Sequence, residues 1–168
     1  MNIAISTVKE SDITKVIEIQ DECNLSRWSA EDYQKEIKRK TSILLTAKIR
    51  SETVGFLTAR FIKFKVHAEE SVERADMDIL NFGVFTKFQK RGIGNLLFEH
   101  LFNEFTVIRL ETVWLEVRES NVAAIGFYKK RGFQAVQTRK NFYRQPVENA
   151  VVMKLKASKL DYKIFNKT

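Results

Sequence analysis

Apolar residues repeat every three to four positions in two segments near the beginning of the chain. Residues 13–19 show this repeat directly after Ser11-Asp12, a pair that can cap a helix, so a helix is predicted to begin there. Ser29 has Asp32 three residues after it, a loose capping box, which predicts a second helix that extends to about Lys40.

Alternating apolar and polar residues predict strands in the middle of the chain. Residues 43–48 and 53–65 have this pattern, and Arg50-Ser51-Glu52 between them favours a turn, which predicts a hairpin. The polar and acidic residues 66–76 predict a loop, and residues 78–85 predict a third strand.

The second half of the chain alternates between helix and strand patterns. Gln89-Lys90-Arg91-Gly92-Ile93-Gly94 precedes apolar residues at 97, 98, 101, 102 and 105, which predicts an amphipathic helix with glycines at its start. Then follow a predicted strand 112–117, a helix from Asn121 to Arg131 that Gly132 ends, and strands 133–139 and 150–155. This order predicts an α+β (mixed α/β) fold with a central sheet.

The composition is that of a globular protein. The chain has 168 residues, 44% hydrophobic and 30% charged, and its single cysteine, Cys23, excludes an internal disulfide. Its apolar runs are far shorter than the roughly 18 residues of a membrane span, and its first residues lack the layout of a signal peptide. We therefore expect a cytoplasmic protein with no membrane contact and no metal.

The positive charge is concentrated near the end of the chain. Residues 129–168 carry 11 Lys/Arg and 2 Asp/Glu, a net charge of +9, whereas residues 1–128 carry a net charge of −1. Such a basic region favours polyanions: RNA, a ribosome or a phosphorylated cofactor. A solvated basic face that only aids solubility explains the charge equally well.

The glycine-rich helix start can bind a phosphate. A helix N-terminus exposes unpaired N–H groups, and Gly92 and Gly94 let an anion approach the backbone closely. The segment is not a Rossmann fingerprint, because position 97 is leucine, and no Gly-Lys-Ser/Thr of a P-loop follows. It predicts a pyrophosphate cradle of another kind.

Three motifs together resemble the GNAT superfamily of acyl-CoA-dependent N-acetyltransferases, over about residues 3–156. They are Gln89-x-x-Gly92-x-Gly94, the strand Trp114-Leu115-Glu116-Val117, and Asn121-x-x-Ala124-x-x-Phe127-Tyr128-x-x-x-Gly132-Phe133. The chain is most similar to the bacterial ribosomal-protein-alanine N-acetyltransferases, through Trp114 to Arg118, Ser120-Asn121 and Arg139 to Tyr143.

The resemblance implies a GNAT-like fold and a donor. Its mostly antiparallel central sheet has about six to seven strands, is splayed at the CoA site and is flanked by about four helices. Residues 1–157 would form this domain, followed by a basic tail, 158–168. Acetyl-CoA would be the cosubstrate, bound by Phe82, Gly83, Val84, Gln89, Lys90, Arg91, Gly92, Ile93, Gly94, Asn95, Asn121 and Tyr128.

Two residues have catalytic roles by this resemblance. Glu116 would be the general base, and strand alternation places it on one face with Trp114 and Arg118. A structural ion pair with Arg118 or an arginine elsewhere is the alternative for Glu116. Tyr128 would be the general acid that protonates the leaving thiolate, and the alternative is a core tyrosine.

The acceptor implied by the resemblance is the N-terminal α-amine of a protein, a ribosomal protein beginning with alanine, contacted by Trp28 and Tyr143. An α-amine has a reference pKa of about 7.7–8.0, against about 10.4 for lysine, so a modest carboxylate base is enough. A small amine (polyamine, amino acid or aminoglycoside), a protein lysine, or a non-catalytic module that binds acyl-CoA or RNA are the alternatives.

Some features depart from the resemblance. The segment between the predicted strands is acidic, and we expect it either to attract a basic acceptor or to be merely solvated. Its acidic residues are Glu69, Glu70, Glu73, Asp76 and Asp78. Phe142 replaces a usual tyrosine, and Asn149 stands where an aspartate is common.

Overall fold

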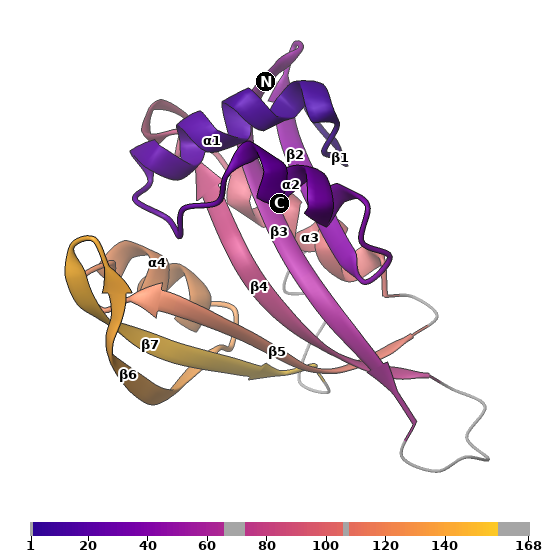
Figure 1. Cartoon of the computed structure of the whole chain (residues 1–168). Helices are drawn as coiled ribbons and strands as arrows, with labels where there is room; N and C mark the ends of the chain where they lie inside the picture. Colours follow the sequence, from indigo (N-terminus) through magenta and orange to yellow (C-terminus); the bar gives the residue numbers. More distant parts are fainter. Residues whose placement is uncertain (1, 66–72, 106–107, 158–168) are drawn as a thin grey trace. The chain divides into compact units, whose positions relative to one another are not determined.

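The computed structural model describes residues 2–65, 73–105 and 108–157 (Figure 1). These residues form the following elements, in chain order: β1 (Ile3–Thr7), η1 (Glu10–Asp12), α1 (Ile13–Glu22), α2 (Ala30–Ile37), β2 (Ser42–Ile49), β3 (Glu52–Phe64), β4 (Arg74–Val84), η2 (Thr86–Phe88), α3 (Ile93–Asn103), β5 (Arg109–Arg118), α4 (Val122–Lys129), β6 (Gln134–Arg144) and β7 (Val147–Lys156).

The strands hydrogen-bond in the order β1-β2-β3-β4-β5-β7-β6. Neighbouring strands pair antiparallel at β1–β2, β2–β3, β5–β7 and β6–β7, and parallel at β4–β5. The predicted mixed α/β fold, with a mostly antiparallel sheet and about four helices, is therefore confirmed. The described residues form two compact units, residues 2–61 with 80–105, and residues 62–65 and 73–79 with 108–157.

The first unit has a core on each face of its strands. Leu44 of β2 and Phe56 of β3 belong to one apolar cluster with Val16 of α1 and Tyr33 of α2. Gly55 points to the other face, where a Cβ would lie 3.3 Å from Ile93 at the start of α3. Figure 1 accordingly shows α1 and α2 in front of these strands and α3 behind them.

The predicted capping box at the start of α2 is confirmed. Ser29 Oγ accepts a hydrogen bond from the Asp32 N–H at 3.1 Å, and Asp32 Oδ2 accepts one from the Ser29 N–H at 2.8 Å. The helix ends at Ile37, before the predicted Lys40. Buried Gln20 holds the connection from α1, because its Oε1 accepts from the Trp28 N–H at 3.0 Å.

The predicted helix cap at Asp12 is wrong. No side-chain cap is formed there, because the Asp12 carboxylate faces the β2–β3 hairpin, 2.7 Å from Lys48 Nζ and 3.2 Å from Thr53 Oγ1. Strand β1 was not predicted. Its five residues pair with β2 from Ile3–Ile49 to Thr7–Leu45.

The loop predicted for residues 66–76 extends too far, because its last residues belong to a strand. β4 begins at Arg74, because residues 74–79 form a parallel ladder with β5, so Asp76 and Asp78 are strand residues. Glu73 pairs with Lys63 at 3.0 Å. Glu69 and Glu70 lie outside the described residues, and attraction of a basic acceptor by this segment stays a prediction.

The second unit consists mainly of β5, β7 and β6 with α4. Asn121 caps α4 as predicted, with its Oδ1 accepting from the Ala124 N–H at 3.0 Å. Gly132 follows the helix with φ +87°, a conformation that favours glycine, and a Cβ there would lie 3.3 Å from Leu155. Among the helices in the described ranges, none has the length and apolar character required to span a membrane.

The capping box gives the first testable prediction. Replacing Ser29 by alanine removes the acceptor for the Asp32 N–H, and should lower the free energy of unfolding by about 1 kcal/mol. Urea denaturation followed by circular dichroism measures this change. Ser51→Ala, in the exposed β2–β3 turn, is the control and should have no effect. Equal stability of the two variants would contradict the role assigned to the cap.

Candidate functional site

The end of β4 is shaped by a glycine. A Cβ on Gly83 would lie 3.0 Å from both Ile19 Cγ2 and Leu25 Cδ1, so a larger residue would crowd α1 and the chain after it. The next carbonyl, that of Val84, accepts from Gln89 Nε2 at 3.0 Å and from Cys23 Sγ at 3.4 Å. Gln89 therefore braces the strand end, a role that its motif spacing did not indicate.

The start of α3 fits an anionic group such as a pyrophosphate. Gly92 is the N-cap with φ +82°, has no side chain to cap the helix, and has open space where a Cβ would be. Lys90 and Arg91 are exposed, and neither forms an ion pair within the described part of the chain. Uncapped N–H groups, two cationic side chains and free space are the features that such a group requires.

Two predicted residues of the first unit have side chains in apolar contacts. The Phe82 ring packs edge-on against Phe98 at a centroid distance of 5.1 Å. The half-buried Trp28 ring lies 5.2 Å from the Tyr33 ring, and both Trp28 backbone groups bond to Gln20. Trp28 thus anchors the α1–α2 connection, and its contact with substrate stays a prediction.

Glu116 is held in an ion pair. Its side chain is 31% exposed, and its Oε1 accepts from Nη1 of Arg139 on β6, which reaches across β7. The alternative interpretation of Glu116, an ion pair with an arginine elsewhere, therefore describes the structure, although the partner is Arg139 and not Arg118. The pair does not exclude the catalytic role, which stays a prediction.

Tyr128 is buried on α4 against aromatic rings. Its ring centroid lies 5.6 Å from those of Phe127 and Phe133. Burial raises the pKa of the Tyr128 phenol above its ordinary value near 10, partly offset by the charge of Arg131. The phenol therefore keeps its proton at neutral pH, as a proton donor must, while it also belongs to the core as the alternative proposed.

Tyr143 lies under a guanidinium. The Arg118 Cζ is 4.1 Å from the Tyr143 ring centroid, a cation–π contact. Burial raises the pKa of Tyr143 to about 12, while the positive charge of Arg118 acts in the opposite direction. Glu116, Asn121, Tyr128 and Tyr143 all belong to the second unit.

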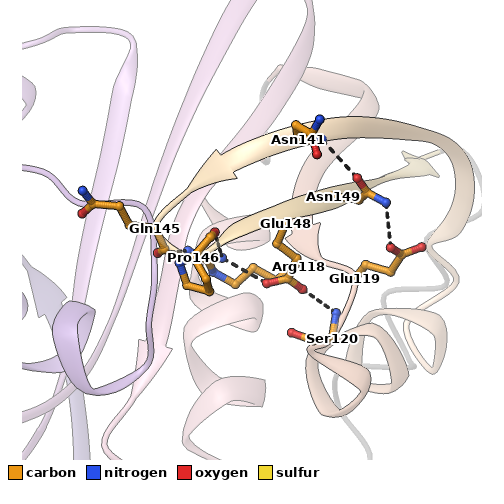
Figure 2. Close-up of polar contacts among 8 residues, drawn as sticks. All are labelled: Arg118, Glu119, Ser120, Asn141, Gln145, Pro146, Glu148 and Asn149. Carbon is orange, nitrogen blue, oxygen red and sulfur yellow. Dashed lines mark hydrogen bonds and ion pairs between the residues drawn. The ribbon is translucent and has the colours of Figure 1, made fainter.

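Figure 2 shows a polar network that the sequence did not indicate. Arg118 Nη1 donates to Glu148 Oε2 at 3.0 Å, and Glu148 Oε1 accepts from the Ser120 N–H at 2.7 Å. Asn149 lies beside it, with its Nδ2 donating to Glu119 Oε2 at 3.0 Å. The β5–β7 register, in which Arg118 pairs with Ala150, brings these residues together, and the sequence pattern alone does not give that register.

The β6–β7 ladder contains a bulge opposite Asn149. Arg139 pairs with Ala150 and Tyr143 with Glu148, so three β6 residues face one residue of β7. The Asn149 Oδ1 accepts from the Asn141 N–H at 3.0 Å, and Asn141 has φ +52°. Asn149 therefore satisfies a backbone donor that the bulge removes from the ladder.

These features define a class of protein. The model of the acetyltransferase (GNAT) family matches residues 13–133, and the chain belongs to this family. The predicted acyltransferase class is thus confirmed, and acetyl-CoA is the acetyl donor of the family.

Within the family, the chain is similar to enzymes that bear one name. The chain is 32% identical over 157 residues to the [ribosomal protein bS18]-alanine N-acetyltransferase of Salmonella typhimurium, covering 92% of this chain and 97% of that protein. It is 29% identical to the Escherichia coli protein of the same name, with the same coverage of each. The predicted resemblance to this group is confirmed.

The fold is also similar to that of solved acetyltransferase structures. The crystal structure of the Escherichia coli enzyme matches with a TM-score of 0.72 and 25% identity, covering 92% of this chain and 94% of that one. Arabidopsis thaliana NAA60 in complex with a bisubstrate analogue matches with a TM-score of 0.79 over 92% and 98% of the two chains. At 23% identity, this second likeness supports the fold alone.

The bulge gives a prediction about the residue at 149. Asn149→Asp would keep the acceptor for Asn141 but place a second carboxylate beside Glu119, and should lower stability by about 0.5–1 kcal/mol at low salt. Added salt should reduce this loss, because screening weakens repulsion between exposed charges. Urea denaturation at two salt concentrations measures both effects.

The matched control is the double variant Asn149→Asp/Glu119→Gln, which removes the second charge. It should recover the stability lost in Asn149→Asp. A loss that persists in the double variant and does not change with salt would contradict the electrostatic cause.

Proposed function

We propose that the protein transfers an acetyl group from acetyl-CoA to the N-terminal α-amine of a protein, with a ribosomal protein beginning with alanine as the acceptor. The observation that carries this proposal is the 32% identity, over 92% of the chain, to an enzyme named for the alanine of ribosomal protein bS18. The alignment covers 97% of that enzyme, so the similarity extends over nearly its whole length.

Donor binding is assigned to the residues of the glycine-rich motif. The uncapped start of α3, with Lys90 and Arg91 beside it, suits the pyrophosphate. The main chain of Phe82, Gly83 and Val84 would pair with the pantetheine arm, as an added strand. Asn121 and Tyr128 would complete the CoA contacts.

The chemistry needs one proton acceptor and one proton donor. Acetyl-CoA supplies the acetyl group as an activated thioester. Glu116 takes a proton from the acceptor amine, directly or through water, while the nitrogen forms a bond to the acetyl carbon. Tyr128 gives its proton to the sulfur as the carbon–sulfur bond breaks. This role requires a protonated phenol at neutral pH, and burial keeps Tyr128 in that form while making it a weaker acid than a free tyrosine.

Acceptor contacts are assigned to Tyr143 and Trp28. Tyr143 lies in the same unit as Glu116, on a hairpin strand adjacent to the bulge. The proposal places the enzyme in the cytoplasm, and assigns weak contact with the ribosome or RNA to its basic C-terminal region. The predicted domain, 1–157, and tail, 158–168, are part of the proposal.

The experiment is thiol release from acetyl-CoA with a panel of acceptors. Peptides with a free α-amine beginning with Ala, Ser, Met or Gly should react, whereas α-blocked peptides with a free lysine, and polyamines, should not. Glu116→Gln and Tyr128→Phe should each lower kcat about 10²-fold or more. Glu111→Gln, in the same strand as Glu116, is the control and should retain full activity.

Other outcomes would replace the proposal. Release only with small amines would make the protein an acetyltransferase of that class. Saturable CoA binding without release on any acceptor would leave a non-catalytic module. Full activity of Glu116→Gln would reject this residue as the base without rejecting the acceptor class.

A further inference from the structure

Arg118 is a buried cation at the end of β5, two residues after Glu116. Its side chain is only 10% exposed, and a buried guanidinium requires compensating partners. Its partners include Glu148 at 3.0 Å and the carbonyls of Gln145 at 3.0 Å and Pro146 at 3.4 Å (Figure 2). The Tyr143 ring centroid lies 4.1 Å from the guanidinium carbon. These partners lie on the β6–β7 hairpin or its turn.

Glu148 uses both carboxylate oxygens. Oε2 accepts from Arg118, and Oε1 accepts from the backbone N–H of Ser120, in the corner between β5 and α4. These hydrogen bonds from Ser120 and Arg118 hold the pKa of Glu148 below its ordinary value. One carboxylate therefore ties β7 to the segment that carries Arg118 and leads to Asn121.

The hairpin needs this connection because its own ladder is interrupted. Between the Arg139–Ala150 and Tyr143–Glu148 pairs, three residues of β6 face only Asn149. Tyr143 is the first paired residue after the bulge, so the ladder fixes the backbone only on the C-terminal side of this residue. The guanidinium over the ring supplies a second constraint.

We propose that Arg118 and Glu148 are a positioning pair for acceptor binding: together they hold the ring of Tyr143 and the Gln145–Pro146 turn in the orientation that the acceptor peptide meets. The proposal rests on the proposed function, and deepens it by naming two positioning residues to which the family resemblance assigned no role. Neither residue touches the reacting atoms.

Arginine is required for this arrangement. Its planar group carries five donors and can bond two carbonyls and a carboxylate while its face covers a ring. A lysine ammonium can pair with Glu148 but cannot make all these contacts together. Arg118→Lys should therefore retain the charge and lose the orientation of Tyr143.

The experiment measures steady-state kinetics with a free-α-amine alanine peptide. Glu148→Gln and Arg118→Lys should each raise KM for the peptide about tenfold, with KM for acetyl-CoA and kcat changed less than twofold. The control is Glu111→Gln, which removes an Arg74–Glu111 pair of the same length, 3.0 Å, with side chains 25% and 26% exposed. This variant should have the wild-type KM.

A double-mutant cycle separates positioning from general stability. Tyr143→Phe removes the hydroxyl but keeps the ring, and should itself raise KM for the peptide. If the pair acts through Tyr143, adding Glu148→Gln to Tyr143→Phe should raise KM no further. Thermal denaturation of every variant accompanies the kinetics.

The outcomes are distinguishable. No turnover by the wild-type protein with any free-α-amine peptide would reject the proposed function itself. An active wild type with additive effects of Glu148→Gln and Tyr143→Phe, or an unchanged KM in both pair variants, would overturn the positioning role alone. Unfolding of both Glu148→Gln and Arg118→Lys would also overturn it, because the pair would then be a requirement of the fold.

Discussion

The register between β5 and β7 determines which side chains of the second unit meet. Seven consecutive pairs, from Thr112–Lys156 to Arg118–Ala150, join the two strands. Because side chains alternate along a strand, a slip of one residue would turn Glu116 and Arg118 to the opposite face. Small Ala150 lies between Arg118 and Arg139 in this register, which lets the long Arg139 side chain cross β7 to Glu116. The network around Glu148 and the pair at Glu116 both depend on this single alignment.

The sequence predicted those parts of the fold that local chemistry decides. Apolar repeats and caps gave α2, α3 and α4, because Ser29, Gly92 and Asn121 act on their own neighbours. Asp12 shows the limit of this reasoning: its carboxylate accepts from the nearby Lys9 N–H but does not cap α1, and it also bonds to Lys48 and Thr53, which are distant in sequence. For the candidate site, too, the sequence predicted the local features but not the contacts between distant residues. Its motifs could be read directly, but the partners Arg139 and Glu148 could not, since the strand order and the β5–β7 and β6–β7 registers decide which residues come near the end of β5.

Some of the cationic side chains in the second unit are paired with residues of neighbouring strands. The high net charge near the end of the chain suggested a polyanion site, yet Arg139 is paired with Glu116 and Lys154 lies 4.5 Å from the Trp114 ring. Because Arg139 and Lys154 are engaged in these contacts, the net charge overstates the number of positive side chains that are available to a polyanion. At the start of α3 in the first unit, Lys90 and Arg91 are exposed and form no ion pair within the described residues, and Arg91 lies 5.7 Å from the Phe88 ring.

The two arginine–glutamate pairs near the C-terminal end of β5, Arg118–Glu148 and Arg139–Glu116, differ in how deeply they are buried. The Arg118–Glu148 pair is largely buried, and each group has further partners, so removing either one leaves a buried charge uncompensated. The Arg139–Glu116 pair has a half-exposed guanidinium, which also lies 4.3 Å from the Phe142 ring, and exposed pairs are held weakly. Under the proposed function, Arg139 would have to leave Glu116 before an acceptor amine could reach the carboxylate, and a half-exposed pair exchanges at little cost in free energy. The buried Arg118–Glu148 pair would stay in place meanwhile, because separating it would leave buried charges uncompensated.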